Sequence, residues 1–108
     1  MDRLTGAEFA ARRHLLGLTL DQLAAVLGVN PRTVRAWESG RDLIPPRISL
    51  EFVALIDEHT ELVRQMLDAG VPVYIPRDGA APHPRGWHVA AAARAIAVEP
   101  DLIVEWLA

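Results

Sequence analysis

The sequence predicts a mainly α-helical protein with a small strand-and-helix region in its C-terminal part. Two short helical segments, each with its own capping signals, follow one another between residues 19 and 40. A longer segment over residues 47–69 keeps apolar side chains at intervals of three and four. It could form one long helix or two short ones, and the absence of glycine and proline favours one. One β-branched run occupies residues 71–76. These observations divide the chain into a helical domain over residues 1–69 and a smaller region over residues 70–108.

The composition is that of an ordered protein. Hydrophobic residues make up 51% of the 108 positions and charged residues 23%, which is far from the signature of disorder. There is no cysteine, so neither disulfides nor thiolate metal sites are expected, and a cytoplasmic location fits. The first residues lack the apolar stretch of a signal peptide, and no run is long enough to predict a membrane span. We therefore expect neither export nor membrane insertion.

The net charge of −3 conceals two halves of opposite sign. Up to Arg47 the chain has seven arginines against five acidic residues, whereas the remainder has four arginines against nine acidic residues. A basic N-terminal part suits a phosphate backbone, and the acidic C-terminal part is better placed facing solvent or a protein partner.

The first three helices follow from local capping chemistry. Two capping boxes predict the first two helix starts, and their residue pairs are Thr5 with Glu8 and Thr19 with Gln22. Gly28 predicts the end of the second helix, because glycine adopts the left-handed conformation that stops a helix. Asn30 is then an N-cap and Pro31 the first residue of a third helix that runs to Glu38.

The third helix is predicted to have one apolar and one basic face. Val34 and Trp37 are expected in the core, and the residues expected to point outward are Arg32, Thr33, Arg35 and Ala36. An arginine can present its guanidinium fork to guanine O6 and N7 in the major groove, and a threonine can hydrogen-bond a base. We therefore expect base contacts from Arg32, Thr33, Arg35 and Asn30, although Asn30 alone could be only a cap. A solvated surface arginine is the alternative for Arg32 and Arg35.

Phosphate contacts are expected at the ends of these helices, where backbone N–H groups and short polar side chains can face a duplex. The candidates are Ser39, Arg41, the backbone at Leu20, and Arg12. For Arg12 or its neighbour Arg13, an ion pair with Glu8 or Glu38 is the competing role.

The C-terminal region contains one predicted strand, Val71 to Pro76, and no second strand-like run. We therefore expect this strand to pair with the same strand of a second copy. An alanine-rich helix over residues 87–98 and a final short helix from Pro100 to Leu107 are predicted to follow. The residues expected at a homodimer interface are Val73, Tyr74, Ile75, Trp87 and Trp106. For Trp87 and Trp106, a place in the core of the same chain is the alternative.

The segment Gln22-Leu23-Ala24, the turn at Gly28, and Val34 to Arg41 followed by Pro45 resemble the lambda-repressor-like, or XRE-type, helix-turn-helix family over about residues 5–66. The resemblance implies a helical bundle whose third helix, here Pro31 to Glu38, enters the major groove. It also implies a structural role for the acid at Glu38. The chain differs from a typical member because one uninterrupted helix after Pro46 replaces separate fourth and fifth helices.

The order of elements is similar to that of a narrower group, the small dimeric repressors related to anti-CRISPR-associated regulators. In that group an arginine at the position of Arg32 contacts DNA. This resemblance implies a homodimer that represses its own operon by binding an inverted repeat in double-stranded DNA.

A different class of function remains open beside this one. An antitoxin-like module could use the acidic C-terminal half to bind a protein partner while the helix-turn-helix regulates transcription. An enzyme is not expected, because the sequence contains no recognisable catalytic constellation. Neither a cofactor nor a metal is expected, since the four histidines lack metal-ligand spacing.

Overall fold

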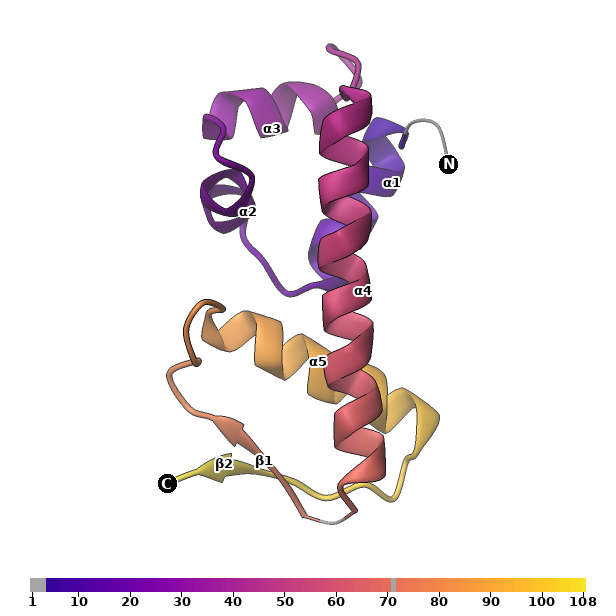
Figure 1. Ribbon diagram of the computed structural model, residues 1–108, viewed down its shortest axis with the longest axis vertical. Coiled ribbons are helices and arrows are strands. Elements are labelled where there is room, and N and C mark those ends of the chain that lie inside the picture. Colours follow the sequence, from indigo (N-terminus) through magenta and orange to yellow (C-terminus); the bar gives the residue numbers. More distant parts are fainter. Residues whose placement is uncertain (1–3, 71) are drawn as a thin grey trace. The chain divides into compact units, whose positions relative to one another are not determined.

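The computed structural model describes residues 4–70 and 72–108, which form five helices and two strands (Figure 1). In chain order the elements are α1 (Gly6–Leu15), α2 (Leu20–Leu27), α3 (Pro31–Glu38), α4 (Pro46–Asp68), β1 (Val73–Pro76), α5 (Arg85–Val98) and β2 (Val104–Leu107). The chain divides into two compact units, Met1–Ile56 and Asp57–Ala108, and the boundary lies inside α4. Among the described helices, none combines the length and apolar character needed to cross a bilayer.

The helix starts of the first unit have the predicted capping chemistry. The Thr5 hydroxyl accepts a hydrogen bond from the Glu8 backbone N–H at 3.1 Å, and the Glu8 carboxylate accepts one from the Thr5 N–H at 2.8 Å. Thr19 and Gln22 form the equivalent pair of hydrogen bonds at the start of α2. These capping boxes and the mainly helical fold are therefore confirmed.

The turn between α2 and α3 is also as predicted. Gly28 has φ of 69°, a left-handed conformation that residues with a Cβ atom rarely adopt, and it ends α2. The Asn30 side chain then accepts a hydrogen bond from the Arg32 backbone N–H at 2.8 Å, and Pro31 occupies the first helical position. The result is a tight connection between two short helices (Figure 1).

The core of the first unit is built around Phe9 of α1, which is fully buried. Its ring lies 4.4 Å from that of Phe52 on α4 and 5.9 Å from that of Trp37 on α3, the latter in an edge-to-face arrangement. These contacts hold the buried face of α3 against its own unit. The prediction that Trp37 belongs to the core is confirmed.

The predicted uninterrupted helix is confirmed as α4, which contains 23 residues. Its apolar positions are buried in each unit that it enters: Ile48 and Phe52 in the first unit, and Val63 and Met66 in the second.

The end of the chain differs from the prediction. Residues 104–107 form β2 and not the end of a helix starting at Pro100. β2 pairs with β1 in parallel, with Val73 opposite Val104 and Ile75 opposite Trp106. The segment alternates half-buried and exposed side chains, the period of a strand, and its β-branched and aromatic residues suit a pleated surface. The final helix was therefore a wrong prediction.

The predicted pairing of the first strand with a second copy is corrected by the same observation, because β1 finds its partner within the chain. The connection between the two strands runs through α5, as a parallel pair requires a crossover. The prediction had β1 beginning at Val71, which lies outside the described residues. The observed strand begins at Val73.

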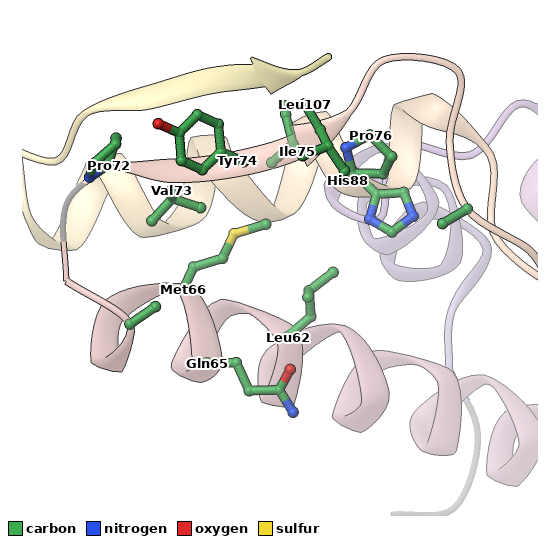
Figure 2. Close-up of a pocket in the computed structure, with 12 residues that line it drawn as sticks. Leu62, Gln65, Met66, Pro72, Val73, Tyr74, Ile75, Pro76, His88 and Leu107 are labelled. Carbon is green, nitrogen blue, oxygen red and sulfur yellow. The ribbon is translucent and has the colours of Figure 1, made fainter.

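The core of the second unit lies between α4, α5 and the inner side of the sheet. Val73 of β1 points toward Met66 of α4, and both side chains are buried (Figure 2). Beside them lies an open, mainly apolar hollow of about 540 Å³, lined in part by Leu62, Tyr74 and His88. Trp87, at 1% exposure, is the largest fully buried side chain, with the His83 ring stacked on it at 3.8 Å.

Candidate nucleic-acid interface

Helix α3 has a buried face and an exposed face. Val34 and Trp37 lie in the core, whereas Arg32 and Arg35 are exposed. The prediction that Ala36 points outward was wrong, because its side chain is only 4% exposed. The turn after α3 folds back against it, with the Asp42 N–H donating to the Ala36 carbonyl at 3.2 Å.

The exposed face of α3 forms the wall of a shallow basic hollow. This hollow has a volume of about 370 Å³, and its lining consists of Arg32, Arg35, Ala36, Ser39 and Arg41. No ion pair between described residues involves Arg32 or Arg35, and Arg41 makes only an exposed contact of 3.5 Å with Asp42. Three guanidinium groups are thus gathered on one surface with their hydrogen-bonding capacity largely free for an anionic partner.

Two of the predicted contact residues have structural roles of their own. The Asn30 side-chain oxygen accepts the N-cap hydrogen bond, which leaves its amide N–H₂ group and the second lone pair of the oxygen for a base. The Ser39 hydroxyl donates to the Ala36 carbonyl at 3.1 Å and accepts from the Arg41 N–H at 3.3 Å. Ser39 therefore fixes the turn that presents Arg41. Thr33 is half-buried at the side of the same helix.

The remaining phosphate candidates lie outside α3. Leu20 is the first residue of α2, where a backbone N–H has no partner within its own helix. Arg12 is half-buried on α1, one turn after Glu8, whose pKa is lowered by hydrogen bonds from Thr5 and further by the positive charge of Arg12. Neither residue lines the basic hollow.

An ion pair holds the C-terminal end of α3 against α1. The Arg13 guanidinium donates two hydrogen bonds to the Glu38 carboxylate, at 2.7 and 3.0 Å, and a third to the Leu18 carbonyl at 3.1 Å. Each side chain of the pair is only 13% exposed, so solvent screens it weakly. Of the pairings considered from the sequence, Arg13 with Glu38 is the one observed. Its bidentate geometry restricts how α3 can rotate.

Gly6 is a positioning residue that the sequence analysis did not identify. A Cβ atom at this position would lie 2.5 Å from the Trp37 carbonyl oxygen and 2.6 Å from that of Glu38. Only glycine lets the first turn of α1 approach the end of α3 so closely. The available signal was a glycine at the start of a helix, a position where alanine has the higher helix propensity.

The predicted dimer residues fall into two groups. Val73, Ile75 and Trp87 are buried in the core of the second unit of the same chain. Tyr74 is 54% exposed, and Trp106 is half-buried with two arginine side chains against its ring. The first three are thus occupied by intramolecular packing, and Tyr74 and Trp106 remain accessible.

Comparison with known families places the site in a class. Residues 9–61 match the helix-turn-helix family model, and this segment contains the capped α2–turn–α3 pair and the basic hollow. The class that these features define is that of DNA-binding transcription regulators. Within it, the matched segment, just under half of the chain, is similar to a helix-turn-helix domain of the XRE type, a kind of domain that binds double-stranded DNA. No curated protein matches the chain.

Proposed function

We propose that the protein is a dimeric transcriptional repressor that binds an inverted repeat in its own promoter. Two copies of α3 would occupy successive major grooves about 34 Å apart, so a pseudopalindromic operator would match the two-fold axis of the dimer. Dimerisation would make occupancy depend steeply on protein concentration, which suits a gene that limits its own expression. The element order resembling anti-CRISPR-associated regulators supports this mode of control. We assign no catalytic activity and no cofactor to the chain.

The observation that carries the proposal is the basic exposed face of α3 opposite its buried face. Because Val34 and Trp37 fix the helix in the core, the guanidinium groups of Arg32 and Arg35 have a defined direction away from it. Defined direction is what distinguishes base readout from diffuse attraction to phosphate.

The side chains divide by the part of DNA that they would contact. Arg32 and Arg35 would read guanine edges, with Thr33 and the free amide of Asn30 as further base contacts. Arg41, the Ser39 turn, the Leu20 N–H and Arg12 would contact phosphate and fix the register of α3 in the groove. Arg41 is especially suited to phosphate, since it is highly exposed and follows the end of the reading helix.

The decisive experiment measures binding of the purified protein to the DNA upstream of its own coding sequence, by gel shift and fluorescence anisotropy. Each Arg32 contact contributes about 1–3 kcal/mol and a dimer makes two, so Arg32→Ala should weaken operator binding by about 2–6 kcal/mol, which is roughly 30- to 25,000-fold. Non-specific binding should change much less. Arg64→Ala is the matched control, because Arg64 is exposed and paired with Glu61 and Asp68 on α4.

Operator binding that is unaffected by Arg32→Ala would contradict the proposed docking of α3. Absence of binding above the non-specific level would contradict the repressor itself and favour the antitoxin-like alternative, in which the acidic second unit binds a protein partner.

A further inference from the structure

Helix α5 is apolar on two faces. The face formed by Trp87, Ala91 and Ala95 is buried within the second unit. On the other side, Val89, Ala93 and Ile96 recur at intervals of four and three and are exposed; we call these three residues the outer stripe. A surface helix normally directs polar side chains to solvent, and a helix that is apolar all round is normally covered.

The outer stripe forms one wall of a groove whose other wall is β2. The groove has a volume of about 300 Å³, and the residues contributed by β2 are Val104, Glu105 and Trp106. Ile75 and Ala92 complete it. The groove therefore lies along a strand, within one compact unit, and has a mainly apolar surface.

The same strand has an unpaired edge. The sheet of the described residues contains only β1 and β2, so each strand is hydrogen-bonded along one side. Parallel strands are normally covered on both faces, and an open apolar edge is a template for pairing with another chain. Beyond the groove, Ile103, which precedes β2, and Leu107, which ends it, are 52% and 55% exposed.

From these observations we infer that the α5/β2 groove is the homodimer interface, and that its occupant is the same surface of a second copy. This inference rests on the proposed function for its biological purpose. About a two-fold axis, the two β2 edges would run antiparallel and form a four-stranded sheet, with the two outer stripes packed together on one side. The small side chain at Ala93 lets two identical helices approach closely.

The charges around the groove favour a second copy as the occupant. The outer stripe carries no charge, so two identical stripes do not repel each other. The rim contains both signs: Glu105 on β2, and Arg77 and Arg85, whose guanidinium groups lie 5.4 and 4.4 Å from the Trp106 ring centre. None of the three takes part in an ion pair between described residues. A surface with both signs at its rim can find opposite charge on its own two-fold mate.

The test is the oligomeric state of the full chain, measured by sedimentation equilibrium over a concentration series. The wild type should have about twice the 11.9 kDa chain mass. Ala93→Glu and Ala93→Arg each place a charge on the stripe and should raise the dimer dissociation constant by at least about tenfold, whatever the sign of the charge. Ala11→Glu, at an exposed helical alanine of the first unit, should leave the mass unchanged. Because Ala93 is exposed in the single chain, helical circular dichroism should persist in both variants.

A monomeric wild type, or Ala93 variants that associate as strongly as the wild type, would overturn the inference. The proposed function can be refuted independently of this interface. Arg32→Ala should keep the dimer mass and lose operator affinity, whereas Ala93→Glu should lose both. A wild-type dimer that Ala93→Glu dissociates but that never binds its upstream DNA would sustain the interface and refute the repressor.

Discussion

His59 is a fully buried histidine whose two ring nitrogens are both engaged. Nδ1 lies 2.8 Å from the Arg94 guanidinium, which can only donate, so Nδ1 accepts and carries no proton. Nε2 therefore carries the proton and donates to the Trp87 carbonyl at 2.9 Å. Burial lowers the pKa of His59, as do the nearby Arg94, His83 and His88, while the hydrogen bond to the carbonyl opposes them.

Acidification should therefore destabilise the second unit through His59. The pKa of His59 is lower in the folded state than its ordinary value of 6.5, so folding favours the neutral ring. The stabilisation that the neutral ring provides is complete above pH 6.5 and is lost as the pH falls toward the folded-state pKa. The loss is at most about 1.4 kcal/mol per pH unit. Urea unfolding followed by tryptophan fluorescence, from about pH 7.5 to about pH 5, should show it.

Two variants isolate the contribution of this histidine. His59→Gln should be less stable than the wild type at neutral pH, and its stability should depend less on pH. Part of the remaining pH dependence comes from His88, because burial also lowers the pKa of that side chain. His14→Gln, at an exposed position, should keep the wild-type slope. Equal slopes in the wild type and His59→Gln would show that His59 does not sense pH.

Among the elements, α3 depends on α1 for its orientation. In Glu38→Gln the Arg13 guanidinium loses its carboxylate partner and has little solvent around it. The free energy of unfolding should therefore fall by about 3 kcal/mol, the lower end of the range for breaking a buried ion pair. Operator affinity should fall as well, because α3 is then less firmly held. Urea unfolding and anisotropy titration measure the two effects.

The exposed pair Arg47–Glu51 provides the control for this prediction. Its side chains are 70% and 43% exposed, and Glu51→Gln should cost no more than about 0.5 kcal/mol. If Glu38→Gln cost as little as Glu51→Gln, the pair would not be the anchor of α3.

Elements whose signals are local could be predicted, and the strand whose partner is distant could not. The capping boxes join residues three positions apart, so the sequence alone specifies them. β2 becomes a strand because Val104 lies beside Val73, 31 positions earlier. The basic face of α3 was predictable from helical periodicity, whereas the close approach at Gly6 depends on how α1 and α3 pack.

For the whole molecule, the salt dependence of DNA binding should report how many copies bind. Each neutralised phosphate contributes about 0.9 to the slope of log affinity against log salt concentration. If Arg41 contacts phosphate in both copies of a dimer, Arg41→Ala should reduce the slope by about 1.8. Anisotropy titrations at several salt concentrations give this value, and Arg64→Ala should leave it unchanged. A reduction of only about 0.9 would indicate one bound copy.

The parallel pairing of β1 with β2 also has a consequence for biosynthesis. A ribosome makes the chain from its N-terminus, so every helix of the first unit can find its partners while the second unit is still incomplete. β1 must wait until α5 and then Val104 have been made before its strand partner exists. During that interval β1 has no strand to pair with, and its unpaired backbone is a template for association with other chains.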